Sequence, residues 1–195
     1  MSLFKQQRDH VRLSIQDTTV RLFKEKGYEN VTIDEITKSV GIAKGTFYNF
    51  FSSKLDILMA WAEQEFRKFD FTEAMNANKT MNENLDRLIE ILDKAIQQEE
   101  MLFRSFLFEI IGVFDDRRFD FISIFSGVIR SSNDFNKIGT QLIDEKINML
   151  NSTLYLGIIH WFRQGNTSQG LKEHLQKLKE ICLYGIMTNF EEVGK

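Results

Sequence analysis

Residues 32–54 read TIDEITKSVGIAKGTFYNFFSSK, and this stretch decides the fold. Thr32, followed three residues later by a glutamate, forms a capping box that begins a short helix expected over 33–40. Gly41 ends that helix, because glycine accepts the left-handed backbone of a C-terminal cap. A second short helix is expected over about 43–50. Two short helices around a glycine-containing turn are typical of a helix-turn-helix.

The flanking segments complete a small helical domain around this stretch. Upstream, apolar residues recur at helical spacing over 8–26, and Gly27 follows as a C-terminal stop. Downstream, Ser53 caps a helix that begins at Lys54 and continues to about Phe69. We expect the first three helices to form an N-terminal helix-turn-helix domain, residues 1–54.

The rest of the chain, residues 55–195, also has helical patterns throughout. Thr80 and Glu83 form a capping box before one clean apolar stripe that ends at Ile96. The 195-residue chain contains no proline, the commonest helix breaker. The sequence therefore predicts an all-α protein of about nine helices, whose second domain is the larger one. The remaining apolar stretches are 100–114, 119–129, 138–162 and 171–190.

Charge is distributed unevenly between the two expected domains. Residues 1–54 carry nine Lys and Arg against six Asp and Glu, and residues 55–195 carry sixteen against twenty-two. The first domain is therefore +3 and the second −6. A basic head on an acidic body suits a protein that meets a polyphosphate at one end only.

No residue has the spacing of a catalytic or metal site. Cys182 is a lone thiol in an apolar run, where a small packing residue is the favoured interpretation. His160 stands beside Trp161 without a second ligand at metal-site spacing, which favours a core or interface histidine. Glu99 and Glu100 are interpreted as the acidic start of a helix. We predict a non-enzyme without catalytic residues, metal or cofactor.

The sequence also predicts a cytoplasmic location without a membrane partner. The longest apolar run, 155–162, is far shorter than the roughly 20 residues that cross a bilayer. The polar N-terminal stretch lacks the apolar segment of a signal peptide.

The second helix of the helix-turn-helix has two faces of different chemistry. Phe47 and Phe51 are four residues apart and are expected to face the domain core. Lys44 is suited to guanine O6 and N7 or to a phosphate, and Thr46 to a base or phosphate through its hydroxyl or to thymine through its methyl group. These two residues are the predicted determinants of sequence preference.

The neighbouring positions suit contacts with the DNA backbone. Gly45 costs on the order of 1 kcal/mol relative to alanine inside a helix, which close approach to DNA would explain. Tyr48 is expected to bind a phosphate, and Asn49 either a base edge or the backbone. Thr32 and Lys54 stand at helix N-termini, which attract phosphates. The predicted DNA-binding residues are Thr32, Ala43, Lys44, Gly45, Thr46, Tyr48, Asn49 and Lys54.

Residues 8–56 resemble the DNA-binding domain of the TetR family of transcriptional regulators, over about a quarter of the chain. The departure lies at Asn49-Phe50, where many members have a histidine nearby, and it bears on base preference. The matching motifs are Lys26-Gly27-Tyr28, Thr32-Ile33-Asp34-Glu35-Ile36, Gly41-Ile42-Ala43-Lys44-Gly45-Thr46-Phe47-Tyr48 and Phe51-Ser52-Ser53-Lys54 with Leu55.

The resemblance implies a homodimer that binds a pseudo-palindromic double-stranded operator, with a regulatory and dimerisation domain over 55–195. A small apolar or amphipathic effector is expected to release the DNA by changing the separation of two heads whose half-sites lie roughly 34–36 Å apart. The last two helices, about 138–164 and 171–190, would form a four-helix interface with the partner. The small residues Gly157, Cys182 and Gly185 serve either that interface or packing within the chain.

Six C-terminal aromatic residues are candidates for an effector pocket, although core packing is the favoured interpretation of any one of them. A repressor is the favoured interpretation. A DNA-bound architectural or partner-recruiting protein without an effector pocket is the alternative, and an enzyme or carrier with a vestigial DNA head is disfavoured. The pocket candidates are Trp61, Phe66, Phe106, Phe125, Tyr155 and Trp161.

Overall fold

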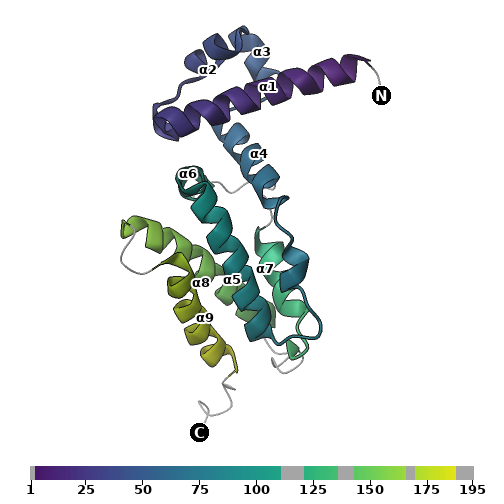
Figure 1. Cartoon of the computed structure of the whole chain (residues 1–195), viewed down its shortest axis with the longest axis vertical. Coiled ribbons are helices and arrows are strands. Elements are labelled where there is room, and N and C mark those ends of the chain that lie inside the picture. Colours follow the sequence, from purple (N-terminus) through teal and green to yellow (C-terminus); the bar gives the residue numbers. More distant parts are fainter. Residues whose placement is uncertain (1–2, 111–120, 136–142, 166–169, 188–195) are drawn as a thin grey trace. The chain divides into compact units, whose positions relative to one another are not determined.

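In the computed structural model, the described residues are 3–110, 121–135, 143–165 and 170–187. Every regular element within these ranges is a helix, nine α-helices and two short 3-10 helices, as the all-α prediction requires (Figure 1). The elements are α1 (Leu3–Lys26), η1 (Tyr28–Asn30), α2 (Ile33–Val40), α3 (Lys44–Tyr48), α4 (Lys54–Phe66), η2 (Phe71–Ala74), α5 (Met81–Gln98), α6 (Glu100–Ile110), α7 (Phe121–Arg130), α8 (Ile143–Arg163) and α9 (Leu171–Met187).

These helices group into two units. The head contains α1 to α4 together with α6, and the body contains η2, α5, α7, α8 and α9. A segment distant in sequence, α6, therefore packs with the N-terminal helices, where it contacts α4 and α1. These units are defined by packing, whereas the predicted border at residue 54 separates two functions. That border stays a prediction.

Several helix ends differ from the sequence prediction. The first helix begins at Leu3 instead of residue 8. The helix expected over 43–50 spans only Lys44–Tyr48, and α4 ends at Phe66 instead of Phe69. The expected ends at 111–114, 119–120, 138–142 and 188–190 lie outside the described residues.

The core of the head forms around α1, which packs against α2, α4 and α6. Ile15 and Phe23 of α1 are fully buried, together with Ile36 of α2 and Phe47 of α3. Gly27 ends α1 with a φ of 82°, in the left-handed region that glycine adopts without strain. Apolar burial of this kind is what holds the short helices α2 and α3 in place, because helices of this length are marginal by themselves.

The body is organised around α5, which contacts η2, α7 and α9. The predicted capping box is confirmed: the Glu83 N–H donates to Thr80 Oγ1 at 3.3 Å, and the Thr80 N–H donates to Glu83 Oε2 at 2.9 Å. The apolar stripe that follows is buried, and the fully buried members are Leu85, Leu88 and Ile89.

Helices α8 and α9 pack closely on each other because of a glycine. A Cβ at Gly157 of α8 would collide with Cδ1 of Leu178 and lie 3.3 Å from Cδ2 of Leu175, both on α9. The small size of Gly157 is therefore used within the chain, which was one of the two interpretations open from the sequence. Cys182 is also buried, and Gly185 has no described side-chain surroundings.

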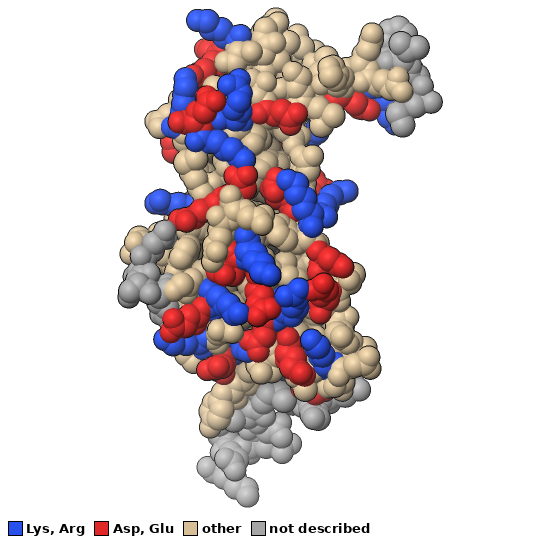
Figure 2. Space-filling view, in the orientation of Figure 1, with Lys and Arg blue, Asp and Glu red and all other residues tan. Residues whose placement is uncertain are grey.

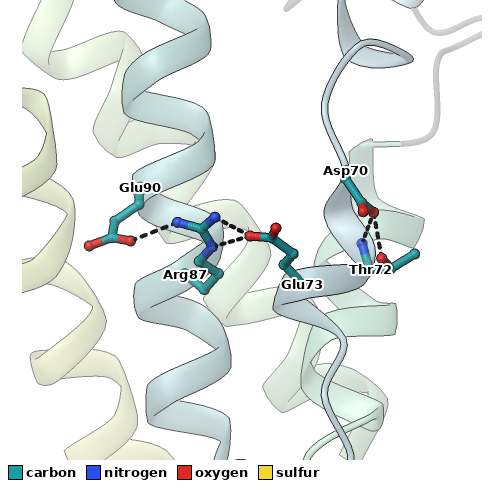
Figure 3. A network of polar contacts seen from close by, with 5 residues as sticks. All are labelled: Asp70, Thr72, Glu73, Arg87 and Glu90. Atoms are coloured by element: carbon teal, nitrogen blue, oxygen red, sulfur yellow. Dashed lines mark hydrogen bonds and ion pairs between the residues drawn. The ribbon is translucent and has the colours of Figure 1, made fainter.

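A polar network ties the outside of the body together (Figure 3). Arg87 of α5 donates from Nε to Glu73 of η2 at 2.8 Å and from Nη1 to Glu90 at 3.1 Å. Glu90 also accepts from Lys172 of α9 at 2.8 Å. These hydrogen bonds from Lys172 and Arg87 lower the pKa of the Glu90 carboxyl. Acidic and basic side chains accordingly interleave over this part of the surface (Figure 2).

A second ion pair in the body is less accessible to water. The side chain of Lys179 on α9 is only 3% exposed and donates to Asp86 of α5, whose side chain is 37% exposed. Because desolvation of an ammonium is costly, this lysine depends on its single carboxylate partner more than a surface lysine does.

No helix in the described ranges is both long and apolar enough to cross a membrane. Among those same residues there is no cluster of three His, Cys, Asp or Glu side chains suited to a metal ion.

Candidate nucleic-acid interface

The two faces predicted for the second helix of the helix-turn-helix are present in α3. Phe47 is fully buried and Phe51 is 3% exposed, whereas Tyr48 is 53% exposed. The Tyr48 ring packs edge-on against the Phe47 ring, with 5.4 Å between centroids. The buried Phe47 therefore supports the Tyr48 side chain, which remains largely exposed to solvent.

Helix α2 is positioned by caps at both of its ends. Thr32 Oγ1 accepts from the Glu35 N–H at 3.2 Å, as the capping box predicted. Gly41 has a φ of 79°, and its N–H donates to the Thr37 carbonyl at 2.9 Å. This left-handed residue turns the chain toward α3, and a residue with a Cβ would be strained there.

Lys44 makes an ion pair that links the two helices of the motif. Its Nζ lies 2.6 Å from Oδ1 of Asp34 on α2, and both side chains are more than half exposed. The hydrogen bond that Lys44 donates to Asp34, together with the negative charge of that carboxylate, raises the pKa of Lys44, so this side chain stays positively charged. Because the pair lies in water, a phosphate or a guanine edge can replace Asp34 at little cost.

Gly45 needs no special space inside the protein. A Cβ built at this position meets no atom within 4 Å, and Gly45 has no left-handed backbone angle. The fold therefore gives no reason for the missing side chain, unlike the situation at Gly41. An external surface that approaches the helix closely is a sufficient reason.

Lys54 has partners that the sequence did not predict. Its Nζ donates to the carbonyls of Tyr28 at 2.8 Å, Val31 at 3.3 Å and Glu29 at 3.4 Å, and lies 4.2 Å from the centre of the Tyr28 ring. This lysine joins the 28–31 turn to the start of α4. Its predicted phosphate contact stays a prediction, and the three carbonyls give the side chain a structural role as well.

The start of α4 and the 28–31 turn have further local supports. Ser53 caps α4 by accepting from the Asp56 N–H at 3.2 Å, and Asp56 Oδ2 accepts from the Ser52 N–H at 2.8 Å. The Tyr28 hydroxyl donates to Glu109 of α6 at 3.4 Å. Burial, with a smaller contribution from the Glu109 charge, raises the pKa of Tyr28. These contacts fix the frame in which the exposed residues of α3 are held.

The remaining predicted contacts, Ala43, Thr46 and Asn49, lie on or next to α3. Ala43 and Asn49 are exposed and Thr46 is half-buried. Asn49 forms the C-terminal cap of α3, and its N–H donates to the Gly45 and Thr46 carbonyls at 3.2 Å. The structure therefore gathers the predicted residues of α3 on one short element, whereas Thr32 and Lys54 stand at the starts of α2 and α4.

Comparison with known proteins identifies this domain. Residues 15–60 match the family described as bacterial regulatory proteins, tetR family. This is a TetR-family domain. The biofilm operon icaADBC HTH-type negative transcriptional regulator IcaR of Staphylococcus aureus (strain Newman) is 38% identical over 82 residues, which cover 42% of this chain and 44% of IcaR. The chain thus matches less than half the length of such curated relatives. They are regulators of transcription, in agreement with the predicted non-enzymatic role.

Solved structures of transcriptional regulators share the fold over most of the chain. Thermus thermophilus FadR, a TetR-family transcriptional repressor in complex with lauroyl-CoA, aligns with a TM-score of 0.68 at 18% identity, covering 91% of this chain and 96% of that one. Bacillus subtilis FadR in complex with stearoyl-CoA aligns with a TM-score of 0.64 at 20% identity, covering 89% and 98%. At these identities the likeness establishes the fold alone.

The six aromatic residues suggested for an effector pocket fall into different parts of this TetR fold. Trp61, Phe66 and Phe106 are buried in the head, where the Trp61 and Phe66 rings both pack on Phe103 at centroid distances of 5.0 and 5.3 Å. Trp161 is buried in the body and Tyr155 half-buried there. The side chain of Phe125 lies outside the described residues. The effector pocket stays a prediction.

A hollow of about 370 Å³ opens on the body instead, between the start of α5, the turn that follows α7, and α9. None of the six aromatic residues lines it. The lining residues are Met81, Asn82, Asp134, Glu180, Leu183 and Tyr184.

Proposed function

We propose that this TetR-family protein is a cytoplasmic transcriptional repressor that binds a pseudo-palindromic operator as a homodimer. The observation that carries the proposal is the division of α3, in which Phe47 is anchored in the core while Lys44, Gly45 and Tyr48 are exposed. Such a helix can enter a major groove without disturbing the domain behind it. Negative regulation by the IcaR relatives supports repression over activation.

The expected dimer interface lies on the last two helices. Leu156 of α8 is 57% exposed and Ile181 of α9 is 69% exposed, and Met149 and Tyr184 on the same two helices are also at least half exposed. Apolar side chains of this size gain free energy when a second copy covers them. A four-helix interface between two copies would do so and would fix the separation of the two recognition helices.

The proposed effector is a small apolar or amphipathic molecule that binds behind the DNA-binding helices. The first compounds to test are long-chain acyl-CoA thioesters, because two structures of the same fold are complexes with lauroyl-CoA and stearoyl-CoA. The alternative is an architectural or partner-recruiting protein of this fold without effector. Operator binding that no acyl-CoA, fatty acid or other apolar compound weakens would favour that alternative.

The test of the repressor proposal is selection of binding duplexes from random DNA and from the DNA upstream of the gene, followed by a Lys44→Ala/Tyr48→Ala variant. Loss of two contacts on each of two protomers is expected to weaken operator binding at least about 100-fold. Both side chains are exposed, so the melting temperature should stay within about 2 °C of wild type. Lys68→Ala removes another exposed, ion-paired lysine of the head and serves as the control. A wild-type protein that selects no sequence would overturn the proposal.

A further inference from the structure

The buried face of α1 continues toward the N-terminus as a row of cations. The residues of α1 that are fully buried in the head follow a spacing of four, and are Ile15, Thr19 and Phe23. About one, two and three turns earlier, this side of the helix carries a set that we name the basic stripe: Arg12, Arg8 and Lys5. Burying unpaired cations against apolar protein surface is costly. The cationic continuation of this face is therefore better suited to contact an anion than to pack against more protein.

The basic stripe lies on a part of α1 that the head leaves uncovered. Residues 5–10 are exposed on every side of the helix, and Figure 1 shows this end of α1 running on past α3. Asp9 is the one acid among residues 3–14, against three cations. The free end of α1 therefore carries a net positive charge.

Two aromatic rings hold the arginines of the stripe beside the recognition helix. The guanidinium carbon of Arg12 lies 4.7 Å from the centre of the Phe51 ring, and that of Arg8 lies 5.8 Å from the centre of the Phe50 ring. Phe50 and Phe51 directly follow Asn49, the C-terminal cap of α3. A guanidinium that interacts with a ring face retains its N–H donors for an anion.

Among the described residues, the three side chains of the stripe have no acidic partner, whereas four other cations of the first 54 residues do. Within the described ranges, no ion pair joins Lys5, Arg8 or Arg12 to a carboxylate. The cations that do have such a partner in the first 54 residues are Arg21 with Glu25, Lys24 with Glu99, Lys26 with Glu35 and Lys44 with Asp34. In the described part of the chain, no carboxylate within ion-pair distance competes with a phosphate for these three side chains.

We propose that the basic stripe is a second DNA contact, in which Lys5, Arg8 and Arg12 bind backbone phosphates next to the bases that α3 reads. The proposal rests on the DNA-binding function and extends it to a segment outside the helix-turn-helix. Contacts with phosphates add affinity without sequence preference, because every base pair presents the same backbone. The stripe thus supplies affinity and register, and α3 supplies the choice of sequence.

The test is the salt dependence of operator binding by an Arg8→Gln/Arg12→Gln variant. Each phosphate contact contributes about 0.9 to the slope of log Kd against log salt concentration, so loss of two contacts on each of two protomers should reduce the slope by about 3 to 4. Operator affinity at moderate salt should fall at least about 10-fold, while the ratio of operator to scrambled-DNA affinity stays unchanged.

The matched control is Arg21→Gln/Lys24→Gln, which removes the same charge from the same helix on its other face. This variant should change the slope by less than about 1. Equal slope losses in both variants would show that only net charge matters and would overturn the proposal. A fall in the operator-to-scrambled ratio for Arg8→Gln/Arg12→Gln would also overturn it, because the stripe would then be reading bases.

Lys5→Gln guards against a folding defect, because Arg12 packs on Phe51 and its loss can lower the melting temperature of the double variant. Lys5 is exposed, and its substitution should keep the melting temperature and reduce the slope by about 2. If the protein binds its operator but the salt-dependence slope is unchanged in both Lys5→Gln and Arg8→Gln/Arg12→Gln, the proposed role of the basic stripe is refuted. The repressor proposal is then unaffected. A wild-type protein that binds no operator refutes the repressor proposal and the stripe with it.

Discussion

The head and the body are both helical, but their sequences serve different ends. In the head, α3 has five residues and is held by the buried Phe47 and by packing on α2, while Gly45 has no task in the fold and Lys44 and Tyr48 stay exposed. In the body, α8 has 21 residues and packs against α9 and α7, and this packing accounts for its buried side chains. An exposed residue without a structural task is evidence of function, whereas a buried aromatic residue is not.

The largest effect is expected for Asp86→Asn, which tests whether a side chain of the body affects stability without affecting DNA binding. The substitution leaves Lys179 nearly buried without an anionic partner, and we expect a loss of about 2 kcal/mol in unfolding free energy, reduced from the fully buried case because Asp86 is partly exposed. Chemical denaturation measures this loss. Operator affinity of the folded dimer should stay within about twofold of wild type.

Asp86→Leu/Lys179→Met is the companion variant, because it removes both charges together. It should be close to wild type in stability. Equal destabilisation by the single and double variants would contradict the dependence of Lys179 on Asp86.

Gly157→Ala tests whether α8 and α9 are as closely packed as the body requires. The added methyl group collides with Leu178, so we expect a cost of about 1–2 kcal/mol, measured by denaturation. Gly170→Ala is the matched control, because a Cβ there meets no atom within 4 Å. Equal unfolding free energies of the two variants would contradict the claim that the close packing of α8 on α9 depends on Gly157.

Glu83→Gln tests the smallest of these effects, the charge in the capping box of α5. Hydrogen bonds from the backbone N–H and then the hydroxyl of Thr80 lower the pKa of Glu83 below its ordinary 4.5. A lowered pKa in the folded state stabilises the protein above the unfolded-state pKa, and this stabilisation is lost as the pH falls through the folded-state pKa. At pH 7 the variant should melt about 1 °C below wild type, and the two melting temperatures should converge as the pH falls below the folded-state pKa of Glu83. A difference that stays constant over that fall in pH would argue against the charge as its cause.

The elements predicted best from the sequence were those controlled by local contacts. The caps at Thr32, Gly41 and Ser53 act over three or four residues, and all three are present. The same locality gave the split between Phe47 and its exposed neighbours.

Contacts that depend on tertiary structure were not predictable in this way. Lys54 donates to carbonyls more than twenty residues earlier in the chain, and no local pattern announces such a partner. The place of α6 in the head was missed for the same reason, because it depends on packing against α1 and α4. The end of α3 was placed too late because Asn49 and Phe50 are compatible with helix but adopt a turn there.

The central claim, that α3 is shaped for DNA and not for its own fold, is tested most directly at Gly45. The measurement is the unfolding free energy and the operator affinity of Gly45→Ala, taken on the same preparation. We predict a stability that is unchanged or raised by up to about 1 kcal/mol, because the Cβ enters open space on a helix, together with a loss of operator affinity of at least about tenfold. Unchanged operator affinity, or an affinity loss that only follows a loss of stability, would contradict the claim.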